Sequence, residues 1–310
     1  LSRAAGRSAW LWCGGLGLAA LLAGAVRILP WVLDPDVPAR VALPFARGVA
    51  ELAVEAAVMA GWPIGFALAA QRFAERGEAR AMMLLGESPA KTALAQWPVA
   101  LPLALVLALA SALGALDASA PGRMAQDLVD QGRAACAAAS EPRTYAIPFV
   151  DATWLCAPGS APVLYGSGPG SLHSVAFSAR NARIAGDMRR IDLDDARFSL
   201  SSIDAKVHAN HVVLRGMSPW THASNVPPIE RALVVVLAAA LAAAAAIWAS
   251  VTGRAKGPLV AIALGALGPL ATLGLMRALE RADAPAAWYL VTPIASALFP
   301  AVLAMMKRGC

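Results

Sequence analysis

Six long apolar runs constrain the fold of this chain more than any other feature of its sequence. They extend over residues 10–26, 52–70, 93–116, 232–249, 258–276 and 284–306. A helix that crosses the hydrocarbon core of a membrane, roughly 30 Å thick, needs about 20 apolar residues. Across the 310 residues, 58% are hydrophobic and 15% are charged, which is too apolar for an ordinary soluble domain. The sequence therefore predicts an α-helical membrane protein with six transmembrane helices.

The connections between the runs predict the topology. Three runs precede residues 117–228 and three follow them. With the N-terminus in the cytoplasm, ten lysine and arginine residues lie in cytoplasmic connections and five lie outside. Because positively charged connections stay inside, we expect both termini in the cytoplasm and residues 117–228 outside. We interpret the net charge of +6 as part of this topology signal. The sequence has no basic tract with interleaved aromatic residues, so nothing indicates nucleic-acid binding.

The first run has an alternative interpretation. Arg3 and Arg7 precede it, and the small residues 23–25 resemble the cleavage site of a signal peptide. Apolar residues continue past Arg27, which favours an uncleaved helix.

Residues 117–228 predict a separate domain of mainly β structure. Apolar and polar residues alternate there with period two, as in half-buried strands. The alternating pairs are Val175 and Phe177, Ile191 and Leu193, Phe198 and Leu200, Ala205 and Val207, and Val212 and Leu214. Glycine and proline at 158, 159, 166, 168–170 and 186 mark turns. We expect an antiparallel β-sandwich or open roll, entered through a more helical stretch at 124–139.

Two cysteines of this outer domain, Cys136 and Cys156, are the one pair that this topology places in an oxidising compartment. A disulfide between them is favoured over two free thiols.

The same domain contains all four histidines, His173, His208, His211 and His222. The spacing of three between His208 and His211 predicts opposite faces of a strand, which favours solvated or sheet-edge histidines over a metal site. The sequence has no Gly-x-Ser-x-Gly elbow, His-Glu-x-x-His pair, phosphate loop or Cys-x-x-Cys motif. We therefore expect no catalytic residues, no metal and no bound cofactor.

The connection at residues 71–91 is the most informative segment for function. Phe73, Met82, Met83 and Leu85 form an apolar stripe. Arg72, Glu75, Arg76, Glu78 and Arg80 form a charged one. Composition alone favours an amphipathic helix on the membrane surface. The alternative is a coupling helix that docks into a nucleotide-binding subunit.

A resemblance favours the coupling helix. Residues 63–98 contain Pro63, the pair Arg72-Phe73, Glu78, Ala81, Gly86, Ser88 and Pro98. This stretch resembles the LptF/LptG permease family of lipopolysaccharide ABC exporters. The resemblance implies three spans at 1–116 with a cytoplasmic coupling helix at 72–88, a jellyroll-like periplasmic domain at 117–228, and three spans at 229–310.

The resemblance also implies partners and a location. The chain would lie in the bacterial inner membrane as one permease subunit. Its partners would be a cytoplasmic ABC ATPase dimer that uses the ATP, a second LptF/LptG-like permease subunit, a periplasmic β-jellyroll protein, and a membrane lipid as cargo. The residues that would couple the chain to the ATPase are Arg72, Phe73, Glu78, Gly86 and Ser88.

Ionisable residues near the outer ends of the spans have two interpretations. Arg47, Glu51 and Glu55 are four residues apart and share one helical face, so they predict either an internal ladder of ion pairs or a cavity wall. In the second interpretation Arg27, Arg47 and Arg277 would bind phosphate groups of an anionic lipid.

A rival hypothesis for the whole chain is a membrane scaffold or receptor whose outer sheet binds a partner protein.

Overall fold

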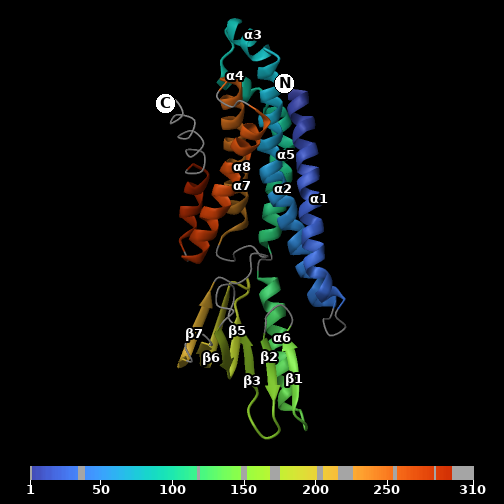
Figure 1. Ribbon diagram of the computed structural model, residues 1–310, viewed down its shortest axis with the longest axis vertical. Helices are drawn as coiled ribbons and strands as arrows, with labels where there is room; N and C mark the ends of the chain where they lie inside the picture. Colours follow the sequence, from blue (N-terminus) through green and yellow to red (C-terminus); the bar gives the residue numbers. More distant parts are fainter. Residues whose placement is uncertain are drawn as a thin grey trace. The chain divides into compact units, whose positions relative to one another are not determined.

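The computed structural model describes residues 2–33, 39–116, 119–147, 152–167, 175–200, 205–215, 226–253, 257–282 and 284–294 (Figure 1). The chain divides into two compact units. One contains Leu1–Val26, Val49–Leu116 and Asn225–Cys310, and is helical. The other contains Arg27–Gly48 and Asp117–Ser224, and includes an antiparallel sheet.

Five helices are long and apolar enough to cross a membrane. They are α1 (Ser2–Val32), α2 (Ala39–Glu75), α5 (Trp97–Leu116), α7 (Pro228–Val251) and α8 (Pro258–Arg281). They coincide with the first five predicted runs, so the helices are compatible with a multi-pass membrane protein. The sixth run begins in a 3₁₀ helix, η2 (Ala286–Val291), and residues 295–306 lie outside the described part of the chain.

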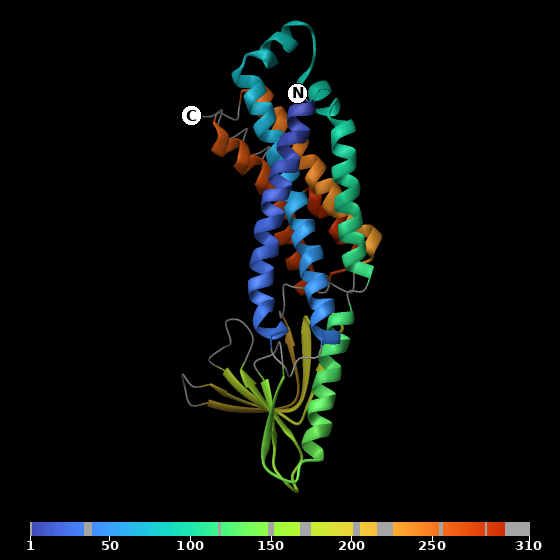
Figure 2. The same ribbon diagram turned by 90° about the vertical axis from the view of Figure 1, so that its right-hand side faces the viewer.

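Helices α1 and α2 pack antiparallel through small residues (Figure 2). A Cβ atom added at Gly61 would lie 2.7 Å from the backbone nitrogen of Cys13, and one at Gly65 would overlap the backbone of Ala9. Gly17, one turn after Cys13 in α1, faces Ala57. Membrane helices associate largely by close backbone approach, and the Gly-x-x-x-Gly spacing of 61 and 65 permits it.

We expect Gly65→Ala to destabilise the helical unit by about 1–3 kcal/mol, because the added methyl group must push α1 away from α2. Gly14→Ala is the matched control, since a Cβ at Gly14 meets nothing within 4 Å. Thermal unfolding of the two variants in the same detergent would measure the difference. Equal unfolding temperatures would contradict this account of the α1–α2 contact.

Helix α5 has buried leucines on one side and exposed leucines on another. Leu103 and Leu107 are fully buried, whereas Leu101, Leu105, Leu109 and Leu113 are between 46% and 63% exposed. The exposed leucines follow a spacing of four and form one apolar stripe. Such a stripe is unfavourable in water and typical of a helix face that contacts lipid.

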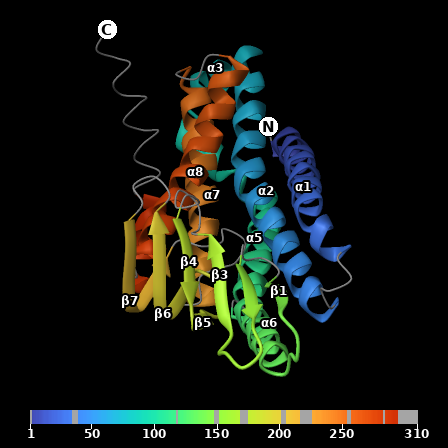
Figure 3. The same cartoon turned by 60° about the horizontal axis from the view of Figure 1, so that its bottom comes forward.

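The second unit contains one antiparallel sheet (Figure 3). Its strands are β1 (Arg143–Ile147), β2 (Ala152–Cys156), β3 (Val163–Ser167), β4 (Val175–Ala179), β5 (Asn181–Ile184), β6 (Arg190–Leu200) and β7 (Ala205–Arg215). Strands β4 and β5 pair with β6 in one register, from Val175 opposite Leu200 to Ile184 opposite Ile191. They therefore act as a single strand that is interrupted at Arg180.

This topology is simpler than the expected jellyroll. A jellyroll has Greek-key crossovers between two sheets. Among the described strands, every pairing joins segments that follow one another along the chain, with β4 and β5 taken together. The prediction of a β domain is confirmed, whereas the jellyroll connections are not present in the part of the chain that the structure describes. The turns predicted at 158–159 and at Gly186 are confirmed, but Gly166 lies within β3, and residues 168–170 lie outside the described residues.

Helix α6 (Ala120–Ala137) packs against one face of the sheet (Figure 2). The indole of Trp154, fully buried, donates a hydrogen bond to the carbonyl of Val129 at 3.1 Å. The backbone N–H of Ile184 donates to Gln126 Oε1 at 2.7 Å. The face under α6 contains Phe177, Ile191 and Leu193, so it forms the core of this unit.

The predicted disulfide between Cys136 of α6 and Cys156 of β2 is present. It closes a loop over a sequence separation of 20 residues and ties the helix to the sheet. We expect reduction to destabilise this unit by about 3 kcal/mol. Mass spectrometry of non-reduced peptides should recover the linked pair. Alkylation of both thiols without a reductant would contradict it.

Candidate functional site

The strongest candidate site in the helical unit is a buried cluster of charged residues. Arg231 of α7 donates a hydrogen bond through Nη2 to Glu55 Oε1 of α2 at 2.8 Å. Its Nη1 lies 3.7 Å from Glu280 Oε1 of α8. The side chains of Arg231, Glu55 and Glu280 are 6%, 2% and 3% exposed. Three helices therefore meet at one guanidinium group.

Such a cluster is costly inside a membrane unless its charges are paired. Ionisable residues within spans are rare, face other helices, and often mark functional sites. Removing one partner from a buried ion pair leaves an uncompensated charge. The cluster can thus act as a latch, because the middle of α2, the start of α7 and the end of α8 cannot separate without exposing unpaired charges.

Sequence reasoning missed this arrangement. The spacing of Arg47, Glu51 and Glu55 predicts a ladder of ion pairs or a cavity wall, and it does not indicate the ion pair that Glu55 forms with Arg231, 176 residues away in sequence. The available signal was that Glu230 and Arg231 are the only charged residues in the fourth apolar helix, and both lie in its first turn.

The connection between α2 and α5 folds into two short helices, α3 (Glu78–Leu84) and α4 (Pro89–Leu94). Gly86 adopts φ of 85°, the left-handed conformation in which glycine commonly ends a helix. The N–H groups of Gly86 and Glu87 donate to the carbonyls of Met83 and Met82. Ser88 then caps α4 by accepting a hydrogen bond from the N–H of Lys91 at 3.2 Å. Two of the five predicted coupling residues, Gly86 and Ser88, therefore shape the turn between the helices.

Helix α3 leaves consecutive apolar side chains uncovered. Met82 and Met83 are just over a third exposed, Leu84 is 89% exposed and Leu85 is 79% exposed. Within α3 only Ala79 is buried. These residues follow the end of the apolar stretch Ala46–Glu75. A run of exposed apolar side chains beside charged ones is typical of an interaction surface.

The remaining predicted coupling residues surround this surface. Arg72 lies exposed in the last turn of α2, and Phe73 is half-buried beside it. Glu78 is 48% exposed and forms an ion pair with Arg76 at 3.7 Å. An exposed ion pair of this kind contributes little to stability. Both charges are therefore accessible to a partner.

The three predicted lipid-binding arginines are divided between the compact units. Arg277 lies on an exposed part of α8 in the helical unit. Arg47 is exposed on α2, and Arg27 belongs to α1, both within the segment Arg27–Gly48 of the second unit. The side chain of Arg27 lies outside the described residues.

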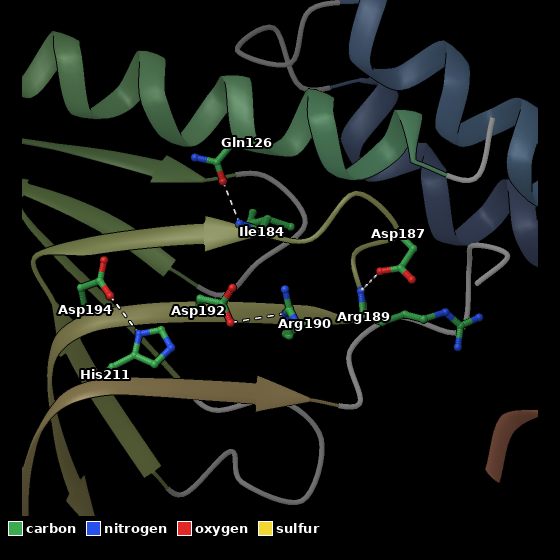
Figure 4. A network of polar contacts seen from close by, with 8 residues as sticks. All are labelled: Gln126, Ile184, Asp187, Arg189, Arg190, Asp192, Asp194 and His211. Carbon is green, nitrogen blue, oxygen red and sulfur yellow. Dashed lines mark hydrogen bonds and ion pairs between the residues drawn. The ribbon is translucent and has the colours of Figure 1, made fainter. Parts of the chain in front are cut away.

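The face of the sheet opposite α6 carries a polar network. Figure 4 shows Asp194 of β6 facing His211 of β7, with Asp194 Oδ1 and His211 Nδ1 3.0 Å apart. Asn181 also donates to Asp194, at 3.2 Å. One step along, Asp195 contacts His208 at 2.6 Å and Arg180 at 2.7 Å. Hydrogen bonds from His211 and Asn181 lower the pKa of Asp194 below its ordinary 3.8.

The placement of the two histidines corrects an expectation. His208 and His211 lie on the same face, because the strands lose their period-two alternation at one point. Buried positions in β6 pass from Leu193 to Ala196, a step of three across Asp195, whose φ is 51°. In β7 the step of three lies between Ala209 and Val212, opposite these residues. His173 and His222 lie outside the described residues.

The contacts of Asp195 predict a pH dependence. The hydrogen bond from His208, and then the charge of Arg180, lower the pKa of Asp195 below 3.8. A lowered carboxyl pKa contributes stability above the ordinary pKa, and that stability is lost as the pH falls through the lowered value. We expect His208→Ala to raise the pKa of Asp195 toward 3.8. A carboxyl ¹³C titration would measure it, and an unchanged midpoint would reject the contact.

No protein-family model matches this sequence, and no curated protein matches it. The relation to LptF/LptG permeases remains a resemblance carried by residues 63–98.

Proposed function

We propose that this chain is a permease subunit of an ABC transporter, and that it moves lipopolysaccharide or a similar amphipathic lipid out of the bacterial inner membrane. The observation that carries the proposal is the exposed apolar surface of α3, formed by Met82, Met83, Leu84 and Leu85. It lies in a connection beyond an apolar helix, which is where a cytoplasmic ATPase could dock.

The rest of the molecule is consistent with this role. The sequence has no phosphate loop, so ATP hydrolysis would come from a cytoplasmic ABC ATPase dimer. The latch of Glu55, Arg231 and Glu280 joins three apolar helices that would move with nucleotide state. A second permease subunit would complete the pathway, and a periplasmic β-jellyroll protein would receive the lipid from the sheet-containing domain.

The charge of Glu78 provides the test. Glu78→Lys should abolish copurification of the ATPase if Glu78 pairs with a basic group on it, since truncating one side of a desolvated interfacial pair costs about 2–5 kcal/mol. Folding should be unaffected, because the partner of Glu78 within the chain is the exposed Arg76. Arg80→Ala is the control. If Glu78→Lys copurifies as much ATPase as the unmutated chain does, α3 is only a helix on the membrane surface.

The second candidate is a membrane scaffold or receptor. It is favoured by the exposed polar face of the sheet, where His208 and His211 are 53% and 57% exposed. Affinity purification separates the two candidates: a scaffold would retain a periplasmic protein and no ATPase.

A further inference from the structure

The face of the sheet opposite α6 contains a shallow basic groove. It has a volume of about 180 Å³ and lies over β3, β4, β6 and β7. Its polar side chains are Tyr165, Ser178, Arg197, Ser199, Lys206 and His208. None of the lining residues is acidic. This volume is below the roughly 300 Å³ at which pockets for drug-sized ligands begin, so the groove suits a single charged group.

The strand register aligns these groups. Tyr165 lies opposite Ser178, Ser178 opposite Arg197, and Arg197 opposite His208. They form one row across four strands. In the next row Ala176 lies opposite Ser199, and Ser199 opposite Lys206. The small side chains at 176, 178 and 199 form the floor of the groove. The longer side chains of Arg197, Lys206 and Tyr165 surround it.

The charges in the groove are not balanced. The carboxylate of Asp195, next to the groove, is shared by His208 and Arg180. Arg197 contributes weakly to the lowered pKa of Asp195. Neither Arg197 nor Lys206 forms an ion pair with another described residue. Elsewhere on the same face, Arg190 pairs with Asp192 at 3.4 Å, and His211 contacts Asp194.

We propose that this groove binds a phosphate group. A guanidinium presents paired donors that match phosphate oxygens, and an ammonium supplies a second positive charge. The hydroxyl groups of Tyr165, Ser178 and Ser199 can donate to the remaining oxygens. The phosphate comes either from free inorganic phosphate or from the headgroup of a lipid. This site is independent of the proposed transport activity, because it depends on the sheet alone.

Calorimetric titration of the full chain in nanodiscs of neutral lipid tests the proposal. One arm uses inorganic phosphate, and the other uses soluble dihexanoyl phosphatidic acid. Arg197→Gln and Lys206→Gln should each weaken binding about tenfold, the loss of one charge-assisted hydrogen bond. Arg183→Gln is the matched control, because Arg183 is an exposed arginine of β5 in the same sheet and does not line the groove.

Two further readouts make the result decisive. Arg197→Lys should recover part of the affinity lost in Arg197→Gln, and circular dichroism should show that each variant keeps its sheet. Binding in both arms identifies a site for phosphate itself, and binding of phosphatidic acid alone identifies a headgroup site. Equal weakening by Arg183→Gln would show unspecific attraction and overturn the proposal. Absence of binding in both arms would overturn it as well.

Discussion

Replacing Arg231 by methionine is expected to lower the free energy of unfolding by about 3–5 kcal/mol, the largest effect on stability that the structure predicts. The loss arises because Glu55 and Glu280 would keep buried carboxylates without their shared guanidinium. Chemical unfolding in a mild detergent, followed by far-ultraviolet circular dichroism, would measure it. Arg277→Met, at an exposed arginine of α8, is the control and should change stability by less than about 0.5 kcal/mol.

A double-mutant cycle separates pairing from packing in the same cluster. Glu55→Gln combined with Arg231→Met should be less destabilising than the sum of the two single variants, because the double variant removes both ends of the ion pair at 2.8 Å. Strict additivity, or equal effects of Arg231→Met and Arg277→Met, would contradict the latch.

The membrane helices could be predicted because their signal is local. A helix in lipid must satisfy its own backbone and present apolar side chains, so each span appears in the sequence as one run. The latch has only a partial signal, the charged pair in the first turn of α7. Glu55, Arg231 and Glu280 belong to three different helices, and only their packing shows which charges meet.

In the sheet, too, features with a local sequence signal could be predicted and features that depend on packing could not. Strands β4, β6 and β7 were predicted from alternation, and their residues Phe177, Ile191 and Val212 indeed contact the core. Alternation in the sequence does not predict the short strands β1, β2 and β3, although Tyr145 and Ile147 alternate in β1. The faces of His208 and His211 were assigned wrongly because period two was assumed throughout. The irregular positions Arg180 and Asp195 break that period, and the charged residues of the groove lie beside this break.

The candidate coupling residues were predicted from a resemblance, and the structure gives them different local roles. Gly86 and Ser88 end one helix and begin the next, a function that any helix–turn–helix connection could require. Leu84, which was not among the predicted residues, is the most exposed apolar side chain of the connection. The leucines, rather than the charged stripe, are therefore the stronger candidates for contact with a partner.

Removing Leu84 and Leu85 should have the largest effect on activity. Burying one leucine side chain is worth about 1.5–3 kcal/mol, so Leu84→Ser with Leu85→Ser should weaken docking of an ATPase by more than about 100-fold. The paired control is Leu155→Ser with Val213→Ser, two exposed apolar residues of the sheet. Stability should change little in either variant, because these side chains are exposed.

ATP-driven release of lipid tests the central proposal most directly. The chain would be coexpressed with a candidate ABC ATPase and a second permease subunit, purified as a complex and reconstituted into liposomes that contain labelled lipopolysaccharide. The proposal predicts that ATP releases lipid to an acceptor in the unmutated complex and in the Leu155, Val213 control. It also predicts that the Leu84, Leu85 variant releases no more lipid than the unmutated complex without ATP. Equal ATP-driven release by both variants, or no dependence on ATP in the unmutated complex, would contradict the account.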